Sequence, residues 1–392
     1  PSLALQVEAM ASYSDTLELQ VEWTKQIGGQ GLSHVHGITT DSIGNVLVAG
    51  YFDDNIDIDG DGNNDFTSNK DSSTRDAYVA KFDSNGNWVW AKQIGGSGSE
   101  DLRTITTDSS GNVLVAGSFG GNIDIDGDGN NDFSSNNDAF AAKFDSNGNL
   151  VWAKHIRSSV TTDNYIYGIT TDSSGNALVA GHFKGNIDID DDGNNDFTSN
   201  NDGSSDSYVA KFDSNGNLVW AKHLGGSNHN RSSGITIDSS GNVFVAVNFR
   251  GNIDIDGDGN NNFTSNGLTD HSVAKFDSNG NLVWAKQFGS IRDDYLRTIT
   301  TDSNGNVLVG GNFNSYIDID GDGNNDFTSI SNHDGYVAKL DSNGNLVWAK
   351  QIGSSLGGNA NSMTTDSSGN VLVVGHFNGN IDIDGDGNND FT

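Results

Sequence analysis

The sequence of 392 residues has no cysteine and a single proline, at Pro1. Without cysteine the chain cannot form a disulfide framework, a thiolate metal site or a thiol nucleophile. It also has no run of about 18 apolar residues, so no segment is expected to insert into a membrane. Basic residues are few, since 20 Lys and Arg stand against 53 Asp and Glu, a formal charge of −33. Such a surface repels nucleic acid and anionic membranes, which argues against both as partners.

The chain does contain a repeat. The string D-I-D-G-D-G-N-N-D-F occurs six times with few changes, at intervals of 67, 64, 66, 64 and 64 residues. The copies begin at Asp57, Asp124, Asp188, Asp254, Asp318 and Asp382. Six units of this length account for most of the chain, which indicates a repeat architecture instead of several unrelated domains.

One unit, residues 99 to 157, shows the expected local structure. The pattern predicts four strands at Ile105–Asp108, Val113–Gly117, Ala139–Phe144 and Leu150–Lys154. Gly and Asn in the turns 109–112 and 145–149 favour hairpins, and the acidic loop separates the second strand from the third. Four antiparallel strands per unit predict an all-β, six-bladed β-propeller over residues 19–392. A parallel β-helix is the rival fold, but it would have shorter rungs and fewer hairpins.

A tryptophan in the fourth strand marks each unit. The six copies are Trp23, Trp90, Trp152, Trp220, Trp284 and Trp348. We interpret them as core residues that pack between neighbouring blades.

The repeated strands also resemble a known family. The segment G-I-T-T-D-S-S-G-N-A-L-V-A-G (168–181) and the segment Y-V-A-K-F-D-S-N-G-N-L-V-W (208–220) are similar to the SBBP-type β-propeller repeat of bacterial secreted and surface proteins. The likeness extends from about Leu19 to the end of the chain. It implies a propeller fold and an extracellular or cell-surface location, and it says little about function.

The acidic loop predicts a calcium site. Asp57, Asp59, Asp61 and Asp65 alternate along a tight loop, and Gly62 allows the bend. Their carboxylates would converge with the main-chain carbonyl of Asn63, and hard oxygen ligands in this number suit Ca²⁺ better than Mg²⁺. The start of the loop is like an EF-hand, but the Glu at position twelve and the flanking helices are not there. An acidic turn without metal is the alternative.

The pattern D-x-D-x-D-G-x-x-D is similar to the calcium loop of the FG-GAP repeats in integrin α subunits, in which the Asp at position nine closes the shell. That resemblance implies ligands at positions one, three, five and nine of every loop. With the main-chain carbonyl at position seven as a further oxygen, we expect about six ions, one per repeat. In the first three loops the ligand residues are Asp57, Asp59, Asp61, Asn63, Asp65, Asp124, Asp126, Asp128, Asn130, Asp132, Asp188, Asp190, Asp192, Asn194 and Asp196. In the last three they are Asp254, Asp256, Asp258, Asn260, Asn262, Asp318, Asp320, Asp322, Asn324, Asp326, Asp382, Asp384, Asp386, Asn388 and Asp390. The fourth loop has Asn262 at position nine, so its site is predicted to be the weakest.

One connection varies while the turns and acidic loops repeat. It joins the fourth strand of one unit to the first strand of the next, on the same face as the metal loops. Just before each innermost strand it places one residue of a ring of candidate ligand contacts: His36, Arg103, Tyr167, Ser233, Arg297 and Asn361. Varied polar and aromatic groups on a rigid scaffold are typical of a binding surface, although neutral drift of surface loops also explains them.

The strand count predicts that the termini meet. The third strand occurs five times, and the last unit stops after its metal loop at Thr392. Residues 1–18 form an N-terminal segment in which Leu3–Met10 alternates apolar and polar residues, so it could supply the missing strand. We favour insertion into the same chain, because a linked strand has a high effective concentration. Insertion into a neighbouring copy remains open.

These features predict a calcium-binding structural or adhesive propeller of a matrix, sheath, surface layer or appendage, located outside the cell or on its surface. No catalytic residues are assigned and no enzyme activity is expected. A lectin-like propeller that binds carbohydrate through the variable face is one alternative. A filament subunit that donates its N-terminal strand is another, and a propeller hydrolase or lyase is a third. Expected partners are Ca²⁺, a polysaccharide or surface protein, and further copies of the chain. The chain begins at Pro1, and we interpret it as a processed product.

Overall fold

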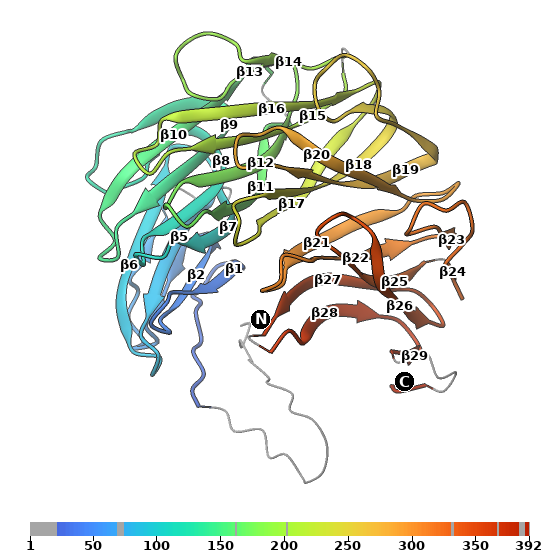
Figure 1. The fold of residues 1–392 in the computed structure, drawn as a ribbon. Helices are drawn as coiled ribbons and strands as arrows, with labels where there is room; N and C mark the ends of the chain where they lie inside the picture. Colours follow the sequence, from blue (N-terminus) through green and yellow to red (C-terminus); the bar gives the residue numbers. More distant parts are fainter. Residues whose placement is uncertain are drawn as a thin grey trace. The chain divides into compact units, whose positions relative to one another are not determined.

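The computed structural model describes residues 22–68, 74–160, 163–200, 203–330, 333–366, 368–383 and 389–391. Every element in these ranges is a β-strand, which confirms the all-β class (Figure 1). The same ranges hold no helix of the length and apolar character that crossing a membrane requires. The predicted strand Leu3–Met10 lies outside the described residues. The chain divides into two compact units, residues 1–155 and 156–392, which we describe in turn.

The first unit contains two repeats. The strands of the first repeat are β1 (Ser33–Thr40), β2 (Val46–Phe52), β3 (Asn55–Ile56), β4 (Phe66–Thr67), β5 (Asp76–Phe82) and β6 (Trp88–Gly96). Those of the second are β7 (Glu100–Thr107), β8 (Val113–Asp124), β9 (Phe133–Phe144) and β10 (Leu150–Ser158), and the last residues of β10 belong to the second unit. Within each repeat the four main strands pair antiparallel in chain order.

The second unit contains the remaining repeats. The third consists of β11 (Tyr165–Thr171), β12 (Ala177–Phe183), β13 (Asn186–Asp188), β14 (Phe197–Thr198), β15 (Asp206–Phe212) and β16 (Leu218–Gly226), and the fourth of β17 (Asn230–Ile237), β18 (Val243–Asp254), β19 (Phe263–Phe276) and β20 (Leu282–Phe288). The fifth consists of β21 (Tyr295–Thr301), β22 (Val307–Phe313), β23 (Tyr316–Ile317), β24 (Phe327–Thr328), β25 (Asp334–Leu340) and β26 (Leu346–Ser354), and the sixth of β27 (Gly358–Thr365), β28 (Val371–Phe377) and β29 (Ile381–Asp382). The third, fourth and fifth repeats show the same antiparallel order as the first unit.

The strands are longer than the sequence pattern predicts. β7 begins at Glu100 instead of Ile105, and β9 begins at Phe133 instead of Ala139. The extra residues of β9 pair with the end of β8, where Ile123 lies opposite Phe133. Main-chain pairing therefore continues up to the rim of the acidic loop, where residue-type preferences no longer indicate a strand.

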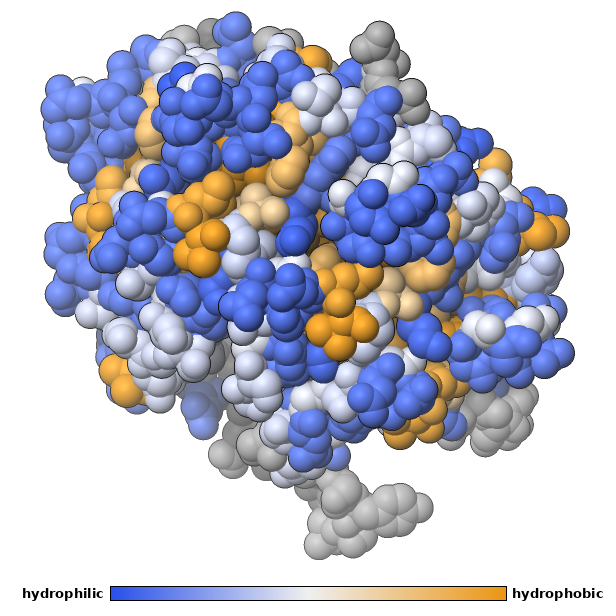
Figure 2. Space-filling view, turned by 45° about the horizontal axis from the view of Figure 1, so that its top comes forward, coloured by the Kyte–Doolittle hydropathy of each residue, from blue (hydrophilic) through white to orange (hydrophobic). Residues whose placement is uncertain are grey.

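The core lies in the second and third strands of the repeats. β12 and β15 are buried at every position, so both of their faces are covered, and both of their edges are paired. This accounts for their apolar sequences without alternation. The face drawn in Figure 2 is largely hydrophilic and its apolar patches are separate from one another.

Neighbouring repeats are joined by the tryptophan of the fourth strand. Trp90 Nε1 donates to the main-chain carbonyl of Ser146 at 3.1 Å, in the third-to-fourth turn of the next repeat. In the same turn Gly148 has a φ of +83°, and a Cβ there would lie 3.0 Å from the Trp90 ring. Trp23, Trp220 and Trp284 repeat the contact, with Ser84, Ser278 and Ser342 respectively. These contacts confirm the predicted packing of tryptophan between repeats.

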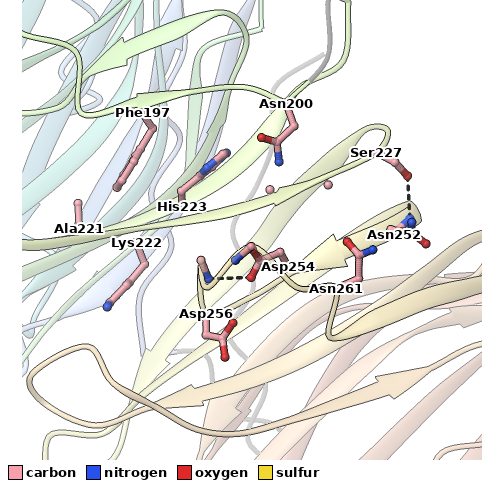
Figure 3. Close-up of a pocket in the computed structure, with 14 residues that line it drawn as sticks. Phe197, Asn200, Ala221, Lys222, His223, Ser227, Asn252, Asp254, Asp256 and Asn261 are labelled. Atoms are coloured by element: carbon pink, nitrogen blue, oxygen red, sulfur yellow. Dashed lines mark hydrogen bonds between the residues drawn. The ribbon is translucent and has the colours of Figure 1, made fainter.

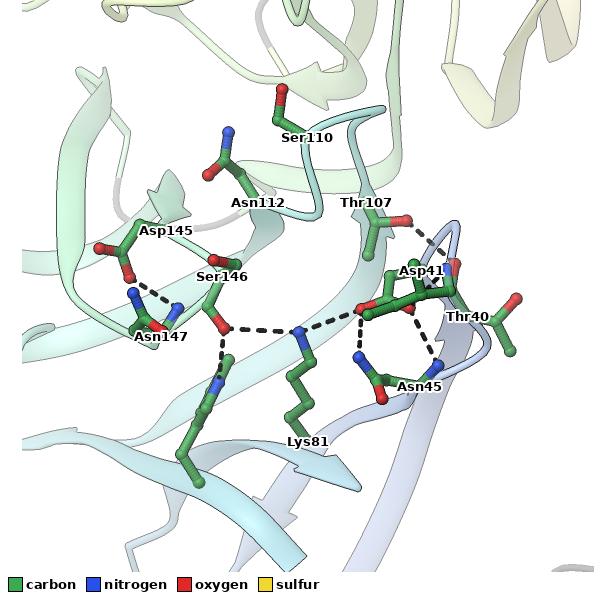
Figure 4. A network of polar contacts seen from close by, with 12 residues as sticks. Thr40, Asp41, Asn45, Lys81, Thr107, Ser110, Asn112, Asp145, Ser146 and Asn147 are labelled. Carbon is green, nitrogen blue, oxygen red and sulfur yellow. Dashed lines mark hydrogen bonds and ion pairs between the residues drawn. The ribbon is translucent and has the colours of Figure 1, made fainter. Parts of the chain in front are cut away.

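A buried ion pair lies beside the contacts of Trp90, Trp220 and Trp284. Lys81 Nζ lies 3.0 Å from Asp41 Oδ2, and both side chains are at least 94% buried. The lysine also approaches the Ser146 carbonyl at 3.4 Å (Figure 4). Equivalent pairs are Lys143–Asp108, Lys211–Asp172, Lys275–Asp238 and Lys339–Asp302. The aspartate is the first residue of the turn between the first and second strands, and the sequence indicated only that turn.

Candidate metal-binding loops and variable positions

Each acidic loop is held at its base by buried apolar side chains. In the first loop Ile56 and Ile58 are fully buried, and Ile56 lies opposite Phe66 in a two-residue ladder. The alternation D-I-D therefore turns the isoleucines into the core and leaves the aspartates on the outer side. The loop from Asp57 to Asp65 closes over a fixed base.

Hydrogen bonds within the loop turn its carboxylates toward one another. Asp57 accepts the N–H of Gly60 at 2.6 Å and that of Gly62 at 2.9 Å. Asp65 Oδ2 accepts the N–H of Ile58 at 2.7 Å, which leaves its Oδ1 for another partner. The same contacts recur in the second, third and fifth loops.

Carboxylate oxygens converge in five successive loops. In each, one oxygen from each of three aspartates lies within 4.8 Å of the other two. The groups are Asp57, Asp59 and Asp61; Asp124, Asp126 and Asp132; Asp188, Asp190 and Asp196; Asp254, Asp256 and Asp258; and Asp318, Asp320 and Asp326. Two oxygens bound to one Ca²⁺ at 2.3–2.6 Å are at most about 5 Å apart, so each group fits a single ion.

Two of the position-nine carboxylates have raised pKa values, because they are partly buried among other carboxylates. Burial raises the pKa of Asp132, and repulsion from Asp126, Asp124 and Asp128 adds to the rise. The pKa of Asp196 is raised in the same way, first by burial and then by Asp190, Asp188 and Asp192. A bound cation would reverse both effects, because it attracts the ionised form.

The structure tests the predicted ligands unevenly. It brings together positions one and three in five loops, with position five in the first and fourth loops and position nine in the other three. The side-chain amide at position seven donates to the position-five aspartate in five loops, at Asn63, Asn130, Asn194, Asn260 and Asn324. The ligand role of the main-chain carbonyls of these asparagines stays a prediction. In the sixth loop Asp384, Asp386 and Asn388 lie outside the described residues, and Asp390 Oδ2 accepts the N–H of Ile383 at 2.7 Å as in the other loops.

The fourth loop differs in one atom. Asn262 Oδ1 accepts the N–H of Ile255, where the other loops use one oxygen of an aspartate. The second carboxylate oxygen of those aspartates is replaced by an amide nitrogen, which cannot bind a cation. The fourth loop therefore offers one ligand oxygen fewer, and its weaker binding stays a prediction.

Beside this loop lies a cavity of about 740 Å³ (Figure 3). Asp254 and Asp256 line one side, and Phe197, Lys222 and His223 line the other. The His223 ring stacks on Phe197 with centroids 5.4 Å apart, and its Nε2 lies 2.9 Å from Asp206 Oδ2. Smaller hollows beside the first and fifth loops hold the equivalent lysines, Lys25 and Lys286.

Replacing Asn262 with Asp is expected to tighten Ca²⁺ binding at one site by on the order of tenfold, because the new carboxylate adds an oxygen and a charge. Calorimetric titration of the variant beside the parent protein measures the change. Asn261→Asp is the control, since it adds the same charge outside the ligand pattern. If the fourth site of the parent fills before the others, the interpretation is wrong.

Every metal loop is also bonded to the preceding repeat. Gly95 and Gly96, at the end of β6, lie opposite Asp124 and Ile123. The equivalent contacts are Gly28 with Asp57, Arg157 with Asp188, Gly225 with Asp254, Gly289 with Asp318 and Gly353 with Asp382. The first aspartate of each loop thus lies at a junction between two repeats.

The predicted ring residues lie at β-bulges. In all six first strands the register shifts by one residue at the ring position: His36, Arg103, Tyr167, Ser233, Arg297 and Asn361. They lie inside the first strands, which begin earlier than the sequence predicted. A bulge leaves one residue unpaired and redirects its side chain, and the ladder resumes on either side of it. The bulge thus displays one variable residue per repeat.

In the first unit two bulged residues converge. His36 Nδ1 lies 3.2 Å from Asp101 Oδ1, and Arg103 Nη2 lies 3.1 Å from Asp101 Oδ2. The aromatic ring of Tyr51 packs edge-on against His36. The Arg75 guanidinium lies 4.4 Å from the centroid of the Tyr51 ring. The sequence did not indicate Tyr51, Arg75 or Asp101, which lie outside the repeated motifs that it marked.

In the second unit each bulged residue has its own surroundings. Tyr167 is 37% exposed and stacks on His182 with a centroid distance of 5.3 Å. Arg297 Nε donates to Asn312 Oδ1 at 2.8 Å. The side-chain Nδ2 of Asn361 lies 3.2 Å from His376 Nδ1. The innermost strands that carry these residues are packed side by side from β11 through β17 and β21 to β27.

Three buried groups with strongly shifted pKa values lie elsewhere, in the fourth and fifth repeats. Burial raises the pKa of Asp270 to about 6 and that of Asp294 to about 7, and it lowers the pKa of His271 to about 3. All three side chains are fully buried. Asp294 accepts the N–H groups of Ser290 and Asn314, so this group fixes main-chain segments.

A family model for a β-propeller repeat, SBBP, matches residues 22–51, 89–118, 283–317 and 347–382. Each matched segment contains a fourth strand, the variable connection and the following first strand. The four segments are therefore β-propeller repeats of this type, as the sequence predicted.

Among curated proteins, the chain is 25% identical over 351 residues to an uncharacterized WD repeat-containing protein of Acanthamoeba polyphaga mimivirus. The match covers 75% of this chain and 25% of the relative, so the chain spans a quarter of that protein's length.

Two solved structures are similar at low identity. The WD40 domain of Pan2 from Neurospora crassa matches with a TM-score of 0.43 and 11% identity, over 90% of this chain and 82% of that one. A calcium-binding protein, regucalcin, from Agrobacterium tumefaciens matches with a TM-score of 0.36 and 10% identity, over 80% of this chain and 73% of the other.

Proposed function

We propose that this SBBP-type β-propeller repeat protein is a calcium-stabilised structural or adhesive protein that works outside the cell. The observation that carries the proposal is the convergence of three carboxylate oxygens in five successive loops. A formal charge of −33 opposes the compact state, and six Ca²⁺ ions would reduce it to −21. Extracellular fluids hold enough Ca²⁺ to load loops of this kind, which have no bidentate glutamate and should bind in the range of about 10⁻⁵ to 10⁻³ M.

We further propose that the six repeats are the six blades of one propeller, in which a Leu3–Met10 segment, from the same chain or from another copy, supplies the third strand of the last blade. The repeated order of four strands and the tryptophan contacts between successive repeats support this arrangement. In such a ring the metal loops lie between blades, because each begins at a residue paired with the preceding repeat. A bound Ca²⁺ ion would then link two neighbouring blades.

Metal analysis of the purified chain tests the proposal. After dialysis against buffered Ca²⁺ the protein should retain about one ion per repeat, and calorimetry should show weak, oxygen-type sites that Mg²⁺ does not fill. A chain that retains no Ca²⁺ at millimolar concentration would remove the basis of the proposal. Electron microscopy of the native material with Ca²⁺ would show whether it belongs to a sheath, layer or appendage.

A carbohydrate-binding role is the second candidate. The bulges support it, since each displays one residue that differs between repeats on a framework that does not. Tyr167 offers an exposed ring to a sugar face, and the guanidinium groups of Arg103 and Arg297 can form paired hydrogen bonds with a carboxylate. The chemistry that fits is a saccharide with an acidic group, such as a uronic acid.

Changing Arg103 and Arg297 together to Ala is expected to abolish binding of uronic-acid saccharides and to leave the unfolding temperature within about a degree, because surface substitutions shift stability little. A glycan array with the parent and the double variant measures it. Arg250→Ala, at an exposed arginine outside the bulges and outside the metal-loop junctions, is the matched control. Equal binding by the parent and the double variant would place the contact on another surface.

A further inference from the structure

The sixth repeat has a strand that the other repeats would bury. In repeats one to five the second strand pairs with the first strand on one side and with the third on the other. Among the described residues β28 pairs with β27 alone, and the two run side by side in Figure 1. The outer edge of β28 therefore presents unpaired main-chain groups, which are a template for another strand.

The side chains of β28 are uncovered in the same way. Val374 is 68% exposed, whereas the alanines in its slot, such as Ala49 and Ala116, are fully buried. Phe377 is 38% exposed, whereas the phenylalanines in its slot in the five other repeats are fully buried. These exposed groups belong to core positions of the repeat, so the strand is shaped to be covered on both sides.

The fourth strand that would follow is already present at the start of the described chain. Trp23 Nε1 donates to the Ser84 carbonyl at 3.1 Å, the contact that Trp90 makes with Ser146. Gly28 pairs with Asp57, as Gly95 pairs with Asp124. Residues 22–28 thus hold the fourth-strand place in front of the first repeat, and no third strand follows β28 in the described part of the sixth repeat.

In sequence, the link between Leu3–Met10 and residues 22–28 differs from the link between the third and fourth strands of the other repeats. In the five other repeats the third and fourth strands are linked by the same five-residue turn, D-S-N-G-N. In four of these turns the serine carbonyl accepts the indole N–H of the preceding tryptophan, and the glycine lies against its ring. The link 11–18 has eight residues and neither Gly nor Asn. Extended, it can span about 27 Å, enough to carry Leu3–Met10 away from residues 22–28.

We propose that β28 accepts Leu3–Met10 from a second copy of the chain. The segment L-A-L-Q-V-E-A-M alternates in the manner of a strand, and its apolar residues would cover Val374 and Phe377. Each copy gives one strand and receives one. Such a contact joins two different surfaces, so it propagates from copy to copy into a filament. The inference concerns assembly and does not depend on calcium loading.

Two variants test the donor and the acceptor separately at saturating Ca²⁺. One lacks residues 1–12 and keeps β28 intact. The other keeps the N-terminal segment and carries Val374→Asp with Phe377→Asp. Sedimentation velocity should show chains much longer than dimers for the parent protein, monomers for each variant alone, and one-to-one dimers when the variants are mixed. Val347→Asp, at a 55% exposed valine on β26, is the matched control and should assemble like the parent.

A peptide of residues 1–12 gives a second measurement that leaves the chain unaltered. Added in excess, it should occupy β28 and shorten the parent assemblies in proportion to its concentration. A monomeric parent whose unfolding temperature falls when residues 1–12 are removed would overturn the proposal, because the strand then inserts into its own chain. Variants that mix without forming dimers, or a peptide without effect on assembled chains, would overturn it as well.

Discussion

Removal of Ca²⁺ by a chelator should lower the unfolding temperature by roughly ten degrees or more. An ion that binds only the folded state with a Kd of about 10⁻⁵ M, the tight end of the range expected for these loops, is at about one hundred times its Kd in about 1 mM Ca²⁺ and stabilises that state by about 2.7 kcal/mol per site. Five described loops bring carboxylates within reach of one ion, so the combined effect is on the order of 10 kcal/mol. Even at the small shift per kcal/mol of a large chain, this is a change of many degrees.

Thermal unfolding followed by circular dichroism, in millimolar Ca²⁺ and in excess chelator, measures the shift. Returning Ca²⁺ should restore the transition, whereas Mg²⁺ should not, because it keeps its waters and prefers stricter octahedral sites. An unchanged midpoint in chelator would show that the loops are acidic turns without a structural ion.

Loss of one buried lysine should also be costly. Lys143→Ala is expected to destabilise the protein by about 3–5 kcal/mol, because it leaves a buried carboxylate without its counter-charge. Lys143 Nζ lies 2.9 Å from Asp108 Oδ2, and the two side chains are 4% and 3% exposed. Denaturant unfolding of the variant beside Lys154→Ala, a partly exposed lysine eleven residues along the chain, measures the difference.

The effect of Lys143→Ala should depend on pH in a defined direction. Burial alone would raise the pKa of Asp108, but hydrogen bonds from Lys143 and Asn112 outweigh it and hold the pKa below its ordinary value. A carboxyl group with a lowered folded-state pKa stabilises the protein above its unfolded pKa, and that contribution is lost as pH falls through the folded pKa. The gap between parent and variant should therefore be full near pH 7 and should narrow below about pH 4. A gap that stays constant down to pH 2 would show that the cost is lost packing and not an unpaired charge.

Much of the fold could be predicted because its determinants are local. The turns D-S-N-G-N and D-S-S-G-N fix hairpins by chain geometry, and the apolar runs between them require buried strands. Their repetition then indicates strand order within each repeat. The extension of β8 and β9 to the rim of the acidic loop could not be predicted, because those residues pair through main-chain groups that every residue type possesses.

The metal loops were predictable for a similar reason, since alternation places carboxylates on one side of the chain. The β-bulges could not be predicted from the sequence. A bulge adds one residue without changing composition, so the residue at Tyr167 or Arg297 looks like any other member of a variable connection. The ion pairs of Lys81 and Asp41 were also missed, although both residues recur in every complete repeat. A lysine within an apolar strand is a signal for a buried partner, and its period of about 65 residues points to the aspartate that repeats with it.

The pairing of each metal loop with the strand before it has a mechanical consequence. If Ca²⁺ fills the loops as we propose, loss of an ion would loosen the junction between two repeats, whereas the paired strands inside each repeat would keep their ladders. Flexible points would then be spaced along the chain at the repeat length of 64 to 67 residues. Under this proposal the surrounding Ca²⁺ concentration would set how many junctions can bend, and so the stiffness of an assembly whose composition stays the same.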